Sequence, residues 1–96
     1  MGEPTKTINV FGDIRYYLNG KLHRTEGPAV EYPNGDKYWY VNGKLHRING
    51  PAVERINGDK WWCINGEEIT IRNYRKFVNK YPGLVNQFLA HQVLNG

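Results

Sequence analysis

Short segments in which apolar and polar residues alternate recur along the first two thirds of the chain. Three of them contain aromatic residues and end on an aliphatic side chain: Arg15–Leu18, Lys37–Val41 and Lys60–Ile64. Alternation with a period of two is typical of β-strands, because successive side chains point to opposite faces of a sheet. We therefore predict three equivalent strands at these positions.

An Asn-Gly pair follows each of these segments. Both residues tolerate the positive φ angles of a type I′ turn, so Asn-Gly between short apolar runs favours a tight β-hairpin. We expect each strand to pass through this turn into a shorter one, at Lys21–Arg24, Lys44–Arg47 and Glu67–Ile69. The remaining strands are predicted at Thr7–Phe11, which would be a first edge strand, and, each entered through a proline, at Ala29–Tyr32 and Ala52–Ile56.

The same residues return every 23 positions. Asn-Gly-Lys-Leu-His-Arg begins at Asn19 and again at Asn42, and Gly-Pro-Ala-Val-Glu begins at Gly27 and again at Gly50. A fixed period of this length is characteristic of stacked repeats, in which each unit buries its apolar side only against its neighbours. We predict one domain over residues 1–96, with a β-repeat array at 7–69 and a helical cap at 70–96.

Strand alternation sorts the aromatic residues into two sets. The first set combines one aromatic and one aliphatic residue per unit and is assigned to the core: Tyr16, Leu18, Trp39, Val41, Trp62 and Ile64. The second set is more mixed and is expected to line an exposed groove: Arg15, Tyr17, Tyr38, Tyr40, Trp61 and Cys63. The pattern thus predicts one buried and one exposed face.

After Gly66 the apolar residues follow the spacing of a helix. The first group predicts a helix with Thr70 as its N-cap, and its members are Ile71, Tyr74, Phe77, Val78 and Tyr81. The Pro-Gly pair at 82–83 is expected to end this helix, and a second apolar stripe follows from Leu84 to Leu94. The fold class is therefore mainly β, a meandering antiparallel β-hairpin repeat with a C-terminal pair of short α-helices.

This pair of helices has two interpretations. Repeat arrays need a terminal element that covers the last apolar surface, so the helices are expected to cap the array. The alternative is a seam for a homo-oligomer, or a surface that docks on a partner, through the segment from Leu84 to Leu94.

Composition and charge narrow the functional classes. The net charge is +4, and residues 70–96 carry four basic residues and no acidic one. This excess of positive charge either lies on a solvated helix face or forms a surface that attracts an acidic partner. The single cysteine, Cys63, excludes an internal disulfide and a cysteine-based zinc site, and fits a reducing, intracellular setting. We expect no signal peptide and no membrane-spanning segment, because no apolar run is long enough.

The repeats resemble the MORN repeat superfamily, whose units are also 23 residues long and fold as successive β-hairpins. The form Trp/Tyr-x-x-Asn-Gly-Lys-Leu-His-Arg-x-x-Gly-Pro-Ala is most similar to MORN-like proteins of tailed bacteriophages and large DNA viruses, over roughly residues 12–72. Two departures from the standard pattern are the absent Glu-Gly-Glu-Trp segment and the arginines, Arg24 and Arg47, in place of the usual glycine. The membrane-lipid roles of standard MORN proteins are therefore not expected.

The resemblance implies a non-catalytic recognition scaffold, of viral or phage origin, that inhibits a host protein, such as a defence protein, in the host cytoplasm. The residues we expect to bind a protein partner are of types that anchor interfaces: Arg15, Tyr38, Tyr40 and Trp61. No cofactor, metal site or catalytic residue is expected, because every candidate acid or histidine in the array recurs with the repeat. Asp13, Asp36 and Asp59 follow turn glycines and are expected to bond within their own turns.

The alternative partner is a nucleotide or nucleic acid, for which the chain would act as a sponge. The residues that would bind its phosphates are Lys21, His23, Arg24, Lys44, His46, Arg47, Arg72, Arg75 and Lys76. A structural role competes with this one: each histidine can bond a backbone carbonyl beside its turn, and Arg24 and Arg47 can pair with Glu31 and Glu54.

Overall fold

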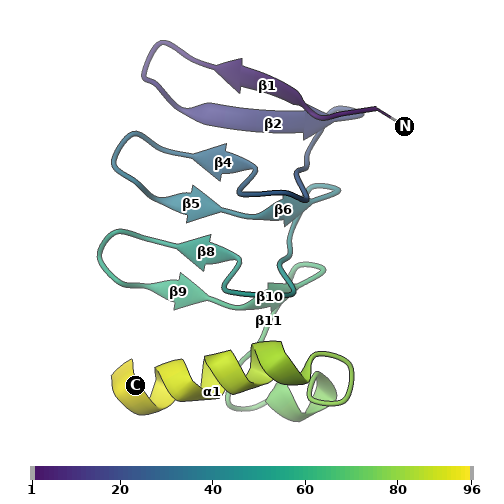
Figure 1. The fold of residues 1–96 in the computed structure, drawn as a ribbon, viewed down its shortest axis with the longest axis vertical. Coiled ribbons are helices and arrows are strands. Elements are labelled where there is room, and N and C mark those ends of the chain that lie inside the picture. Colours follow the sequence, from purple (N-terminus) through teal and green to yellow (C-terminus); the bar gives the residue numbers. More distant parts are fainter. Residues whose placement is uncertain (1, 96) are drawn as a thin grey trace.

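A computed structural model of the chain describes residues 2–95, so Met1 and Gly96, the two ends of the domain predicted over 1–96, lie outside the described residues. The protein is mainly β, with one C-terminal helix and one 3-10 turn (Figure 1). The strands are β1 (Thr5–Ile8), β2 (Ile14–Leu18), β3 (Lys21–Leu22), β4 (Val30–Glu31), β5 (Lys37–Tyr38), β6 (Tyr40–Val41), β7 (Lys44–Leu45), β8 (Val53–Glu54), β9 (Lys60–Trp61), β10 (Cys63–Ile64) and β11 (Glu67–Glu68). They are followed by η1 (Tyr74–Lys76) and α1 (Pro82–Asn95).

The strands form an antiparallel meander. The main sheet has the order β1-β2-β4-β5-β8-β9, with β3 paired to β2, and two small hairpins, β6–β7 and β10–β11, lie beside it. We call residues 5–27, 28–50 and 51–73, each of which contains one hairpin of the main sheet, the first, second and third units. Figure 1 shows these units stacked in chain order, with α1 beneath the last one.

The Asn-Gly turns have the predicted backbone. Asn19, Asn42 and Asn65 have φ angles of 52°, 52° and 50°, and the glycine after each one also has a positive φ. Positive φ at both central residues is the geometry of a type I′ turn, whose twist matches that of the flanking strands. The hairpin prediction is therefore confirmed at all three units.

The strands predicted at Lys37–Val41 and Lys60–Ile64 are each divided into two, as β5 with β6 and β9 with β10. The division in the second unit falls at Trp39, whose N–H donates to Ala52 of the next unit at 2.7 Å, while its carbonyl accepts from His46 of its own unit at 3.0 Å. The strand changes partner at this residue, so one continuous ladder cannot form. The strand predicted at Arg15–Leu18 is present as β2, which begins one residue earlier, at Ile14. The remaining predicted strands are present but shorter, and the first lies at Thr5–Ile8 instead of Thr7–Phe11.

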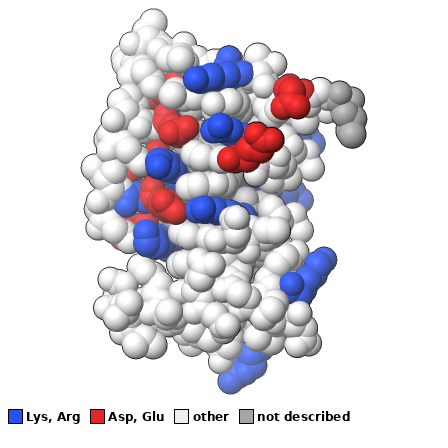
Figure 2. All heavy atoms as spheres, in the orientation of Figure 1, with Lys and Arg blue, Asp and Glu red and all other residues white. Residues whose placement is uncertain are grey.

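One face of the main sheet carries a ladder of opposite charges. Glu31 lies across from Lys37, Lys37 across from Glu54, and Glu54 across from Lys60. Directly opposed residues of antiparallel strands point to the same face, where unlike charges attract. Figure 2 shows this face, on which acidic and basic side chains alternate over the strands. We call it the charged face. α1 itself contains no acidic residue, lysine or arginine.

The opposite face carries a row of aromatic and aliphatic residues. Arg15 lies across from Val30, Val30 from Tyr38, Tyr38 from Val53, and Val53 from Trp61. Val30 and Val53 are buried, whereas Trp61 is 40% exposed. We call this the aromatic face.

The C-terminal segment corrects one prediction. The first helix, expected from Thr70 to Tyr81, is replaced by turns and the short η1. Thr70 is not an N-cap: its N–H donates to the Asn73 side chain at 2.7 Å, and the Asn73 amide donates to the carbonyl of Glu68 at 2.9 Å. An asparagine side chain that bonds nearby backbone competes with the helix ladder, and here the turn is the result. The Pro-Gly pair at 82–83 begins α1, because proline fits the first helical turn.

The main apolar cluster lies between the third unit and α1. Its buried members are Trp62, Ile64, Ile69, Phe77, Leu84, Val85 and Phe88. The helix therefore caps the array, although the predicted pair of helices is a single one. Within residues 2–95 no helix is both long enough and apolar enough to cross a membrane.

The predicted core face is correct only in the third unit. Trp62 and Ile64 are buried there, but the equivalent residues Tyr16, Leu18, Trp39 and Val41 are half-buried. Cys63, assigned to the exposed face, is buried with Val30 and Val53. The difference arises because the array residues in the apolar cluster against α1 all belong to the third unit, so an apolar residue in the earlier units depends on neighbouring side chains for cover.

We expect Phe88→Ala to lower the free energy of unfolding by about 3–5 kcal/mol, because Phe88 is 3% exposed and packs edge-on against Trp62. Urea denaturation followed by tryptophan fluorescence measures this change. The control is Val93→Ala on the same helix, at a side chain that is 84% exposed, which should change stability by less than about 0.5 kcal/mol. Equal losses for the two variants would contradict the capping role of α1.

Candidate functional site

The four residues predicted to bind a protein partner lie on the aromatic face. Register places Arg15, Tyr38 and Trp61 in one row, and Tyr38 lies close enough to Tyr40 to contribute to the raised pKa of Tyr40. Burial, with a smaller contribution from the neighbouring tyrosines, raises the pKa of Tyr40 above its usual value of 10.0. The tyrosine therefore stays neutral at physiological pH.

Tyr32 belongs to the same surface and was missed by the sequence analysis. Its ring meets that of Tyr38 edge-to-face with centroids 5.7 Å apart, and the Arg15 guanidinium lies 5.6 Å from its centroid. The residue was placed in a predicted strand, two positions after Val30, so alternation alone assigns it to this face. The edge-to-face contact fixes the orientation of both rings.

On the other side of the sheet, each arginine of a His-Arg pair is stacked on an aromatic ring of its own unit. The Arg24 guanidinium lies 4.0 Å from the Tyr16 ring centroid, and that of Arg47 lies 3.8 Å from the Trp39 centroid. Each also donates to a proline carbonyl four residues ahead, at 3.2 and 3.1 Å. The arrangement is the same in both units, so it is a property of the repeat.

A glycine lies close to each of these guanidinium groups. A Cβ added to Gly50 would lie 2.7 Å from Cζ of Arg47, and one added to Gly27 would lie 3.0 Å from Cζ of Arg24. The distance at Gly50 is shorter than real Cβ atoms show and the one at Gly27 is at the limit, so the guanidinium would have to move in each case. The glycine of the Gly-Pro-Ala motif is therefore explained by the space that the guanidinium occupies.

The ion pairs expected at this position are present. Arg24 is 3.7 Å from Glu31, and Arg47 is 2.8 Å from Glu54. Each guanidinium thus already has a ring, a carbonyl and a carboxylate as partners. This arrangement favours the structural role over phosphate binding at Arg24 and Arg47.

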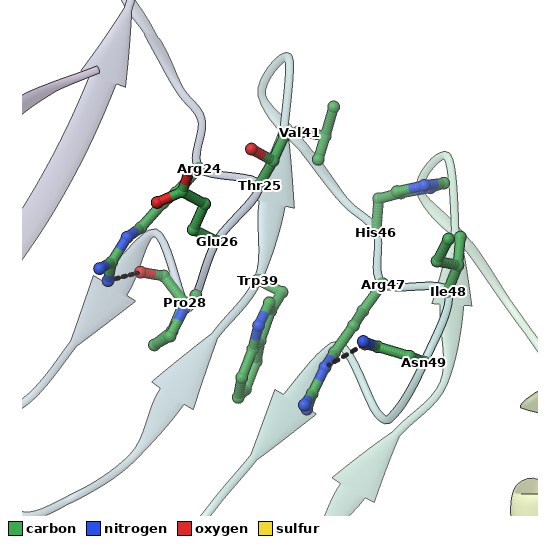
Figure 3. Close-up of a pocket in the computed structure, with 11 residues that line it drawn as sticks. Arg24, Thr25, Glu26, Pro28, Trp39, Val41, His46, Arg47, Ile48 and Asn49 are labelled. Carbon is green, nitrogen blue, oxygen red and sulfur yellow. Dashed lines mark hydrogen bonds between the residues drawn. The ribbon is translucent and has the colours of Figure 1, made fainter. Parts of the chain in front are cut away.

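A groove of about 610 Å³ lies on the charged face, between the loop from Arg24 to Pro28 and the segment from His46 to Asn49. Figure 3 shows the Trp39 ring between these two segments, with the Arg24 and Arg47 side chains on either side of it. The volume is in the range of small-molecule sites. The two guanidinium groups that line it are the ones already paired, so the groove offers mainly apolar contact.

His23 and His46 connect successive units. Nδ1 of His23 accepts the backbone N–H of Asn42 at 3.0 Å, and Nδ1 of His46 accepts that of Asn65 at 2.9 Å. The expected partner was a carbonyl, but the ring accepts instead of donating. A ring that accepts at Nδ1 must be neutral, with its proton on Nε2. Both histidines therefore act in the stacking of units.

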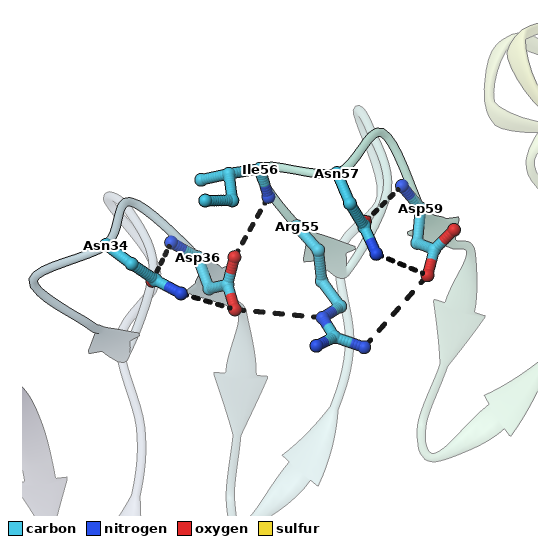
Figure 4. Close-up of polar contacts among 6 residues, drawn as sticks. All are labelled: Asn34, Asp36, Arg55, Ile56, Asn57 and Asp59. Atoms are coloured by element: carbon cyan, nitrogen blue, oxygen red, sulfur yellow. Dashed lines mark hydrogen bonds and ion pairs between the residues drawn. The ribbon is translucent and has the colours of Figure 1, made fainter.

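Asp36 makes a second contact between units (Figure 4). As expected, it bonds within its own turn, where its N–H donates to Asn34 at 2.9 Å and its carboxylate accepts from the Asn34 amide. The other carboxylate oxygen accepts the N–H of Ile56 in the third unit at 2.9 Å. This backbone hydrogen bond is the main cause that holds the pKa of Asp36 below its usual value of 3.8, and Arg55, 3.7 Å away, contributes. Asp13 and Asp59 likewise bond an asparagine of their own turns.

The remaining residues of the predicted anion site lie outside the groove. The stem of Lys21 lies over Gly43, and that of Lys44 lies over Gly66, each in the turn of the next unit. Lys76 pairs with Glu67, and the Arg75 guanidinium lies 5.1 Å from the Tyr74 ring centroid. Arg72 is exposed. The nine predicted residues are therefore dispersed, and do not form one cluster of free cations.

Two observations concern chemistry within residues 2–95. No group of three or more His, Cys, Asp or Glu side chains is placed to hold a metal ion there. Burial raises the pKa of the Cys63 thiol to about 11, so it stays protonated and is a poor nucleophile.

Comparison with protein-family models, curated proteins and solved structures found no match to the chain. Function is therefore inferred from the surfaces described above.

We expect Gly50→Ala to lower the free energy of unfolding by about 1–3 kcal/mol, because the new methyl group would displace the Arg47 guanidinium from Trp39. Urea denaturation gives the value. Gly83→Ala is the control: nothing lies within 4 Å of its added Cβ, so stability should be unchanged or slightly higher. If the explanation is correct, Arg47→Ala removes most of the cost of Gly50→Ala; an undiminished cost would contradict it.

We expect acidification to weaken the fold through His46. Burial lowers its pKa below the usual value of 6.5, so the unfolded chain binds the proton more tightly than the folded one. The contribution of His46 is therefore intact above the unfolded pKa, and stability falls as the pH decreases through it. The position equivalent to His46 in the third unit is Ile69. His46→Ile should therefore be tolerated and should reduce the stability that is lost between about pH 7.5 and about pH 5, as measured by urea denaturation. An unchanged pH dependence would count against this role.

Proposed function

We propose that the protein is a non-catalytic recognition module that binds another protein through its aromatic face. The observation that carries the proposal is the row formed by Arg15, Tyr38 and Trp61, which crosses the main sheet in register. Tyrosine, tryptophan and arginine are the residues that most often dominate the binding energy of protein interfaces.

The aromatic face is also suited to binding because it is rigid. Buried Val30 and Val53 separate the members of the row, and each unit is hydrogen-bonded to the next. A side chain already held in position loses little conformational freedom when a partner binds. Arg15 is the one charged residue of the row, so desolvation of this surface costs less than desolvation of the charged face.

The resemblance to MORN-like proteins of bacteriophages supports a further step. We propose that the partner is a host protein, such as a defence protein, and that the module inhibits it by occupying its surface in the host cytoplasm. The neutral, hydrogen-bonded histidines and the protonated thiol of Cys63 favour recognition over catalysis.

A second candidate is a phosphate-bearing ligand, such as a nucleotide or nucleic acid. It is favoured by one observation, which is that the stems of Lys21 and Lys44 are held on the turns of the next units. Their ammonium groups are therefore positioned one unit apart along an edge of the array. Binding of this kind weakens steeply as salt increases, unlike binding at an aromatic interface.

We expect Tyr38→Ala combined with Trp61→Ala to abolish retention of the partner in a pull-down from bacterial lysate. The matched control is Lys37→Ala combined with Lys60→Ala, at neighbouring positions of the same strands on the opposite face, and it should retain the partner as the wild type does. Circular dichroism verifies the fold of both variants. Loss in the lysine variant alone would overturn the proposal, and a nucleic acid released by salt would favour the second candidate.

A further inference from the structure

The two ends of the array are closed differently. At one end α1 covers Trp62, Ile64 and Ile69 of the third unit. At the other end β1 is the outermost strand of the main sheet, all four of its residues are exposed, and in the described part of the chain it pairs only with β2. Figure 1 shows this strand at the end of the stack opposite to α1.

The hairpin of β1 and β2 also carries three large apolar side chains in solvent. Ile8, Val10 and Phe11 are 62%, 93% and 79% exposed. Clusters of this kind on small proteins commonly mark interaction sites.

The position of Val10 is a contact between units elsewhere in the array. Its equivalents, 23 and 46 residues later, are Pro33 and Ile56. Pro33 lies against Gly12, and Ile56 lies against Gly35, at 3.1 and 2.9 Å from where a Cβ of each glycine would be. Val10 has no preceding unit to contact, so a packing residue is left in solvent.

β1 pairs with β2 in the same register in which β4 pairs with β5, but it lacks the second neighbour that β4 has. Thr7 lies across from Arg15 just as Val30 lies across from Tyr38. Yet β4 also pairs with β2 on its other side, and β8 pairs with both β5 and β9. On the side where β4 and β8 each pair with a strand of the preceding unit, the backbone groups of β1 are unpaired within the described residues. Unpaired backbone groups of an edge strand are a template for pairing with another strand.

We propose that β1 is the interface of a two-fold dimer, in which it pairs antiparallel with β1 of a second copy. A second copy offers only this edge, because α1 lies over the other end of the array. Like-with-like pairing is two-fold symmetric and closes at two copies, whereas a head-to-tail filament would need the end that α1 occupies. The contact continues the antiparallel pairing by which each unit already joins the next.

The side chains of β1 are compatible with this pairing. In an antiparallel pair the end of one strand lies beside the start of the other, so with pairing centred on Thr7 the Val10 of each copy would lie beside Pro4 of the other, and Phe11 beside Glu3. Lys6 is the only charged residue of β1. Pairing centred on Thr7 places it across from the neutral Ile8, so no like charges are opposed.

Sedimentation equilibrium tests the dimer with the protein alone, so the result does not depend on the proposed function. From about 1 μM to about 1 mM the mass should rise from that of the 11.2 kDa chain to twice this value. Val10→Asp combined with Phe11→Asp should raise the dissociation constant at least tenfold (roughly 1.4 kcal/mol). The matched control is Val93→Asp combined with Leu94→Asp, at side chains of α1 that are 84% and 82% exposed, and it should dimerise normally.

Hydrogen exchange provides a second measurement that needs no variant. Amides of β1 that point away from β2 should be protected at high protein concentration and lose protection on dilution, whereas those that already bond β2 stay protected. A monomer at every concentration would overturn the proposal. Dissociation by the α1 variant, with the Val10 and Phe11 variant still dimeric, would also overturn it and place the interface at the C-terminal helix.

Discussion

The fold depends on contacts between one unit and the next, because a single unit has too little apolar surface to be stable alone. Backbone bonds of the same kind recur at each junction: the N–H of Arg24 donates to Tyr40, and that of Arg47 donates to Cys63. The histidine rings and the Asp36 carboxylate add bonds from side chain to backbone across the same junctions. Every other feature described above requires this stacking, including the two faces of the sheet and the position of α1.

In the first two units, the arginine after the histidine covers an aromatic ring that no helix covers. In the third unit α1 buries Trp62, but no helix reaches Trp39, and the Arg47 guanidinium lies on its ring instead. Position 70, equivalent to Arg47, is threonine in the third unit, where the helix takes over this role. The repeat and its cap therefore solve the same problem, which is the exposure of one aromatic ring per unit, by two different means.

The hairpins were predictable because Asn-Gly turns and alternating strands are local signals, confirmed at Asn19, Asn42 and Asn65. The division of the strand at Trp39 was not, since it depends on which neighbour each backbone group finds. The helix expected from Thr70 failed for a local reason, because the Asn73 side chain bonds the backbone that a helix would use. In the candidate site, alternation placed Arg15, Tyr38 and Trp61 on one face. The ion pairs of Arg24 and Arg47 were also expected as the structural alternative, but the stacking of their guanidinium groups on Tyr16 and Trp39 was not.

The junctions also determine how such an array can change in length. The contacts at one junction recur at the next with a shift of 23 residues, so removal or duplication of a whole period would join chemically matching ends. A change of any other size would shift the turn glycines out of register with the side chains that pack on them. Evolution of this molecule is therefore expected to proceed in whole units, and each gained or lost unit would lengthen or shorten its aromatic row by one residue while leaving α1 in place to terminate the stack.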